Sequence, residues 1–164
     1  MTNKAAFTAE EWTELRAAPL MLSVAVSSAD PSGLFGALKE ATSGTRGMIE
    51  SLKAAEGVEL AQELLADRSV PDLPDPKDMI GEGSRDEQMA RLRHSAIAKA
   101  QSALEIVGRK ATPEETSVYR DMLIQVAEAA ASAAKEGGFL GFGGERVSAA
   151  EQDLLAELKG ALNA

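Results

Sequence analysis

Three segments of this chain carry the same helix-start signal, a Ser or Thr followed three positions later by Glu. They begin at Thr8, Thr112 and Ser148, and Pro113 follows the second cap directly. In such a capping box, the hydroxyl oxygen accepts a hydrogen bond from a first-turn amide and the Glu carboxylate accepts one from the amide of the cap. Apolar residues then recur at the helical spacing of three and four positions. The pattern predicts an all-α protein.

The same periodicity predicts where the helices lie and how they are joined. No convincing strand pattern occurs, so we expect residues 1–164 to form a single-domain helical bundle of about six to seven helices. Two connections stand out, a proline-rich loop near 70–83 and a glycine-rich link near 137–147. The short link at 108–111 predicts an antiparallel pair of long helices. The predicted helices cover 8–29, 34–52, 58–67, 84–109, 113–135 and 149–162.

Two of these helices contain residues that oppose helix formation. Pro19 lacks an amide hydrogen, so we expect a kink or a break into two short helices near Ala18. Gly44 and Gly47 each weaken a helix by about 1 kcal/mol relative to Ala, so the second helix is expected to bend or split there.

The composition limits which residues can build the core and which classes of partner the protein can bind. Aromatic residues make up only 4% of the chain and cysteine is absent, so the core is built mainly from aliphatic side chains and thiol chemistry is excluded. The net charge of −9 disfavours nucleic acid. The longest apolar stretch, 20–26, is too short for a membrane span, and no secretory signal is seen, so a cytoplasmic location is expected. The densest basic group, interleaved with acidic residues, is Arg85, Arg91, Arg93 and Lys99.

Candidate catalytic groups are few. A di-iron bundle needs two Glu-x-x-His pairs, whereas His94 is the one histidine here and Arg91 stands three positions before it. No G-x-S-x-G sequence presents a serine nucleophile. We therefore predict no catalytic residue, no metal site and no cofactor. His94 is interpreted as an exposed or boundary side chain, and its alternative role is that of a proton shuttle or ligand contact.

The glycine-rich stretch at 138–144 is the most unusual part of the sequence. Neither a preceding strand nor a following Lys-Ser/Thr completes a phosphate-binding loop. The favoured interpretation is an irregular link in which Phe139, Leu140 and Phe142 plug one end of the bundle. The alternative is a ligand- or partner-binding site beside the last helix. Its candidate residues are Phe139, Phe142, Gly143, Gly144 and Arg146, with His94 as a further candidate.

The two ends of the chain resemble a family of small uncharacterised bacterial all-helical proteins. The resemblance rests on Phe7-Thr8-Ala9-Glu10-Glu11-Trp12 with Ala18-Pro19, and on residues 137–144 with Val147-Ser148 and Glu151. It implies a bacterial cytoplasmic protein and supplies no activity. The closing helix is also faintly similar to tellurite-resistance TerB-like domains, which are associated with acidic metal sites. No acidic cluster matches those sites, so no residue role is carried over.

These observations leave two functional hypotheses. The first is a non-enzymatic helical bundle that binds an unidentified protein partner or small molecule. Under this hypothesis the protein could have a stress-related role or associate as a homodimer. The alternative is a metal-dependent or carboxylate-using enzyme in which His94 moves protons. The first is favoured because no complete catalytic constellation is present.

Overall fold

The computed structural model describes residues 2–29, 34–73, 78, 81–136 and 149–163. Within these ranges the chain forms six α-helices of eight residues or more, a short 3-10 helix and no strand, which confirms the predicted all-α fold. The elements are η1 (Lys4–Ala6), α1 (Ala9–Ala29), α2 (Leu34–Ala54), α3 (Glu59–Ala66), α5 (Arg85–Lys110), α6 (Pro113–Glu136) and α7 (Ala149–Leu162).

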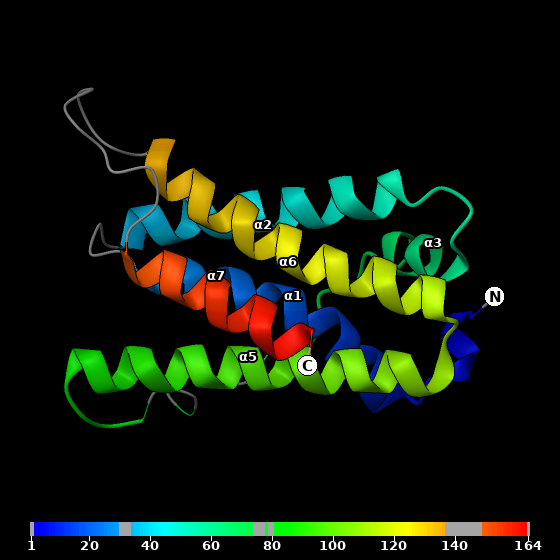
Figure 1. The fold of residues 1–164 in the computed structure, drawn as a ribbon, viewed down its shortest axis with the longest axis horizontal. Helices are drawn as coiled ribbons and strands as arrows, with labels where there is room; N and C mark the ends of the chain where they lie inside the picture. The colour runs from blue at the N-terminus through cyan, green and yellow to red at the C-terminus, as the bar shows by residue number, and fades with distance from the viewer. Residues whose placement is uncertain (1, 30–33, 74–77, 79–80, 137–148, 164) are drawn as a thin grey trace.

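Helix α1 lies at the centre of the bundle and contacts α2, α5, α6 and α7 (Figure 1). Helices α2 and α6 pack against each other along most of their length, and α3 lies across one end of that pair. Helices α5 and α6 run in opposite directions, as the short link predicts. Each nevertheless packs mainly on another helix, α5 on α1 and α6 on α2. The core is largely aliphatic, as the composition predicts.

The glycines of α2 mark close helix contacts. The helix is continuous from Leu34 to Ala54, so the predicted split at Gly44 and Gly47 is wrong. A Cβ atom at Gly47 would lie 2.7 Å from Ala129 Cβ on α6. One at Gly44 would lie 2.1 Å from the Ser23 hydroxyl oxygen on α1. The missing side chains let two neighbouring helices approach, and this packing offsets the low helix propensity of glycine.

Helix α1 also continues through its proline, so a break into two helices at Pro19 is wrong. Because Pro19 has no amide hydrogen, the carbonyl oxygen of Leu15, four residues earlier, has no partner within the helix. The Tyr119 hydroxyl of α6 donates a hydrogen bond of 2.7 Å to this oxygen. Both residues are almost fully buried. A side chain from another helix therefore replaces the missing backbone donor.

The predicted capping boxes at Thr8 and Thr112 are both formed. The amide of each Thr donates to the Glu three residues later, and the Glu amide donates back to the Thr hydroxyl. A further box that we did not predict begins α5, where Ser84 pairs with Glu87. Residue 148, the third predicted cap, lies outside the described ranges, as does the link at 137–147. In the proline-rich loop, 70–73 and 81–83 have no regular structure, as expected.

Candidate functional site

Most of the predicted site residues cannot be compared with the structure. Phe139, Phe142, Gly143, Gly144 and Arg146 all lie in the segment 137–148, outside the described residues.

His94, the remaining candidate, is exposed on α5, as its position among polar residues predicts. It borders a hollow of about 720 Å³ between α1, α5 and α7. In this hollow Arg93 forms an ion pair of 2.5 Å with Glu157. Among the residues that the structure describes, no three His, Asp or Glu side chains are grouped to hold a metal ion. The described carboxylates that line the hollow beside His94 are those of Asp86 and Glu157.

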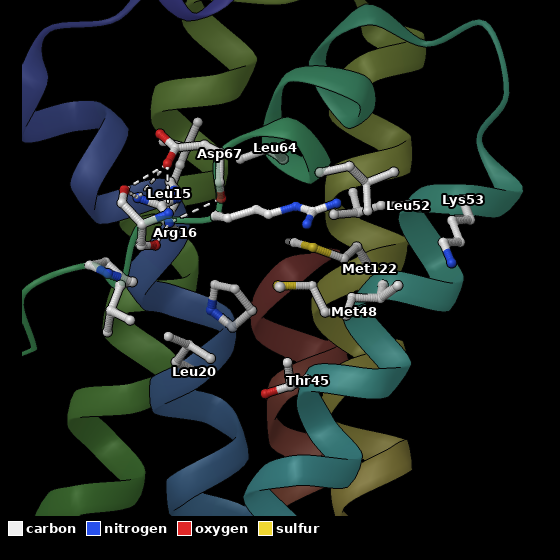
Figure 2. Close-up of a pocket in the computed structure, with 17 residues that line it drawn as sticks. Leu15, Arg16, Leu20, Thr45, Met48, Leu52, Lys53, Leu64, Asp67 and Met122 are labelled. Carbon is white, nitrogen blue, oxygen red and sulfur yellow. Dashed lines mark hydrogen bonds and ion pairs between the residues drawn. The ribbon is translucent and has the colours of Figure 1, made fainter.

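A second cavity, which we call the α1–α3 cavity, lies at the other end of the bundle and has a volume of about 580 Å³ (Figure 2). Its walls come from α1, α2, α3, α6 and the segment 67–71 that follows α3. This volume is within the range of small-molecule sites in proteins, about 300–1,000 Å³. The lining residues are Leu15, Arg16, Pro19, Leu20, Thr45, Met48, Ile49, Leu52, Lys53, Leu64, Leu65, Asp67, Arg68, Ser69, Val70, Pro71 and Met122.

The interior of the α1–α3 cavity is apolar and adaptable. Met48 of α2 and Met122 of α6 lie next to each other at its centre, between Leu20 and Leu52 (Figure 2). Methionine has an unbranched, polarisable side chain that adjusts its shape at low cost, so it suits surfaces that bind varied apolar groups. Aliphatic and thioether groups offer no hydrogen bonds, and the walls therefore favour an apolar occupant over a polar one.

Asp67 organises the polar end of the cavity. Its carboxylate accepts hydrogen bonds from the Lys4 ammonium at 2.8 Å, from the Trp12 indole at 2.9 Å and from the Ser69 hydroxyl at 2.6 Å. The Ser69 amide adds a fourth bond of 3.1 Å. The bond from Lys4, followed by those from Ser69 and Trp12, holds the pKa of the Asp67 carboxyl well below its usual range. Asp67 therefore stays ionised and ties η1, α1 and the segment after α3 together.

Arg16 fastens the segment 67–71 to α1. Its guanidinium donates to the Ser69 hydroxyl at 2.8 Å, to the Asp67 carbonyl at 3.2 Å and to the Ser69 carbonyl. It also lies 3.4 Å from the Asp67 carboxylate and is largely shielded from solvent. Guanidinium is suited to this role because its donors form a rigid planar fork. The chain after α3 is thereby held as one wall of the cavity.

The mouth of the α1–α3 cavity gathers the exposed apolar side chains. In the described ranges, the large hydrophobic residues classed as exposed are Ile49, Val70 and Leu73, and Val70 is 86% exposed. Ile49 and Val70 both line the cavity, and Leu73 follows Val70 closely in the chain. Scattered exposed apolar residues need no explanation, but here two of the three border the same cavity.

The sequence analysis missed this site. The lining residues come from positions as far apart as 15 and 122, and none of them forms a motif. The one available signal was the sequence Asp67-Arg68-Ser69, a charged and polar run directly after a helix with an apolar face. That signal alone does not distinguish a cavity wall from an ordinary solvated turn.

Comparison of the chain with protein-family models, with curated proteins and with solved structures finds no match. The resemblance to small bacterial helical proteins and to TerB-like domains therefore stays a prediction.

Proposed function

We propose that this protein is a non-enzymatic helical bundle that binds a small, largely apolar molecule in the α1–α3 cavity. The observation that carries the proposal is the cavity itself, about 580 Å³ in volume, with Met48 and Met122 at its centre. Burial of an apolar ligand there is favoured by roughly 25 cal/mol for each Å² of apolar surface removed from water. The exposed Ile49 and Val70 at the mouth provide an apolar entrance.

The arrangement of polar groups supports binding rather than reaction. Asp67 and Arg16 line the cavity, but both are occupied by hydrogen bonds that hold the segment 67–71 in place. A general base or nucleophile must be able to reach the reacting atom. These two side chains instead build the wall. We also propose a cytoplasmic location, as the sequence analysis expects.

The proposal is tested with a neutral fluorescent probe, N-phenyl-naphthylamine, whose emission rises in apolar surroundings. We expect saturable binding of a single probe molecule per chain. Met48→Trp should fill the centre of the cavity and weaken binding about tenfold or more, because the larger ring occupies the space of the ligand. Met89→Trp is the matched control, since Met89 is also a partly buried methionine packed on the core but borders the other hollow.

Circular dichroism verifies that both variants remain folded. Equal loss of probe binding in the two variants, or unchanged binding in Met48→Trp, would contradict the proposed site. A second copy of the chain is the competing occupant of the exposed mouth. Light scattering of the wild type and of Val70→Asp tests this alternative. If the wild type is a dimer that Val70→Asp dissociates, and neither protein binds the probe saturably, the site serves self-association and not ligand binding.

A further inference from the structure

The charged residues around the α1–α3 cavity do not balance. The lining contains three cationic side chains, Arg16, Lys53 and Arg68, and one carboxylate, that of Asp67. Arg16 and Asp67 lie 3.4 Å apart and compensate each other. Lys53 and Arg68 thus leave an excess of two positive charges. This excess stands out in a chain whose net charge is −9.

The two remaining cations are unpaired within the described residues. In the part of the chain that the structure describes, neither Lys53 nor Arg68 forms a hydrogen bond or an ion pair. Some other exposed cations of the bundle are paired, such as Arg46 with Glu50 at 2.9 Å and Lys159 with a glutamate of α6 at 2.6 Å, whereas Lys99 of α5 has no partner in the described ranges. The positive groups beside the cavity are therefore available to an external anion.

Both cations are exposed and line the cavity. Arg68 directly follows Asp67 in the wall segment and is exposed. Lys53 stands at the last turn of α2, at the outer edge of the cavity, on the side opposite Arg16 and Asp67 (Figure 2). The methionine-lined interior lies between these two sides. An occupant of this site would keep its charge near solvent and its apolar part inside.

We propose that the ligand is a free single-chain amphiphile with a carboxylate head, of the fatty-acid class; this inference rests on the proposed function. Arg68 binds the carboxylate through its planar fork of donors, and Lys53, across the cavity, adds a second positive charge to the electrostatic potential at the site. Roughly 19 volumes of about 30 Å³, the share of one water molecule, fit in the cavity. A methylene group is of similar size, so the site has ample room for the alkyl chain of dodecanoate.

The experiment compares dodecanoate, dodecanol and dodecylamine, each below its critical micelle concentration, by displacement of N-phenyl-naphthylamine from the full chain. We expect dodecanoate to bind about three- to tenfold more tightly than dodecanol, and dodecylamine to bind most weakly. Added salt should reduce the advantage of dodecanoate, because the cations are exposed to solvent.

The double variant Lys53→Gln/Arg68→Gln should bring the affinity for dodecanoate down to that for dodecanol and leave dodecanol binding unchanged. Arg109→Gln is the matched control, since Arg109 is an exposed cation of α5 that does not line this cavity. Arg68→Lys in the Lys53→Gln background should restore part of the preference, because it keeps the charge without the fork.

The outcomes separate the two proposals. Equal affinities for dodecanoate and dodecanol in the wild type, or a preference that survives the double variant, would overturn the carboxylate assignment and leave the apolar site intact. Failure of both dodecanoate and dodecanol to displace the probe would overturn the proposed function as well. Binding to vesicles of anionic phospholipid without binding of monomeric dodecanoate would overturn the assignment of a free ligand.

Discussion

Removal of the Tyr119 hydroxyl should expose how α1 tolerates its proline. In Tyr119→Phe the ring still fills its place in the core, but the Leu15 carbonyl oxygen loses the donor that lies 2.7 Å away. Tyr119 is 1% exposed and Leu15 is 0% exposed, so the carbonyl is shielded from bulk water. A buried acceptor without a partner costs about 1–3 kcal/mol. In a chain of this size that corresponds to a fall in Tm of roughly 2–4 °C for each kcal/mol.

The cause of this loss can be isolated with a second substitution. Pro19→Ala gives position 19 an amide hydrogen that can donate to the Leu15 carbonyl within the helix. The carbonyl then keeps a partner when the Tyr119 hydroxyl is removed, so Tyr119→Phe should cost less in the Pro19→Ala protein than in the wild type. We expect a coupling free energy of about 1–2 kcal/mol.

Urea unfolding, followed by circular dichroism and by the fluorescence of Trp12, measures all four proteins of this cycle. Ser28→Ala is the control, because the Ser28 hydroxyl donates at 2.8 Å to the Val24 carbonyl, which the backbone amide of residue 28 can already satisfy. Its loss should change the free energy of unfolding by less than about 0.5 kcal/mol. If Tyr119→Phe costs the same with and without Pro19, the hydroxyl does not compensate for the proline and the reasoning fails.

Three further predictions concern packing, acid stability and the cavity wall. Gly47→Ala should destabilise the protein by about 1–3 kcal/mol in urea unfolding, because the new Cβ would lie 2.7 Å from Ala129 Cβ. Gly160→Ala is the control: no atom lies near the added Cβ, so it should stabilise α7 by about 0.5–1 kcal/mol. A gain in stability at both positions would refute the close contact at Gly47. Burial opposes ionisation of Glu115, but hydrogen bonds from Thr112 and Thr2 outweigh it and lower the pKa of Glu115 to about 2 from 4.5. This group therefore contributes about 3 kcal/mol of stability that is present above pH 4.5 and lost as the pH falls towards 2. In Glu115→Gln the free energy of unfolding should depend less on pH across that window. An unchanged pH dependence would contradict the assignment. Asp67→Asn should weaken the wall after α3, lower Tm at neutral pH and speed probe release in stopped-flow fluorescence. Because the pKa of Asp67 is depressed, the difference in Tm between the wild type and this variant should shrink only below pH 3.8. Probe release at the wild-type rate would show that Asp67 does not hold the wall.

The fold could be read from the sequence because its signals are local. Each capping box lies within four residues, and the apolar periodicity of each helix is complete within the helix itself. The boxes at Thr8 and Thr112 form as predicted. The one at Ser84 has the same spacing.

The errors at Pro19 and in α2 share a physical origin. Propensity describes what a residue does to its own helix, whereas the compensating contacts come from other helices. The donor for the Leu15 carbonyl stands 104 positions away. The close approach that Gly47 permits involves Ala129 of α6. No single-helix pattern contains either contact, so the sequence alone left a break or a split open at positions where the tertiary structure supports a continuous helix.

The α1–α3 cavity lies where the chain departs most from ordinary helical rules. Pro19 and Leu15, the two ends of the interrupted backbone bond, both line it, and so do the largely shielded ion pair of Arg16 with Asp67 and the exposed Val70. Each of these features costs stability by itself, since an interior proline, a shielded charge pair and an exposed apolar side chain are all unfavourable. Sequences that fold well keep such exceptions few, and they concentrate them where a site requires them. Their coincidence at one cavity, on segments remote in sequence, therefore favours this end of the bundle as the functional one.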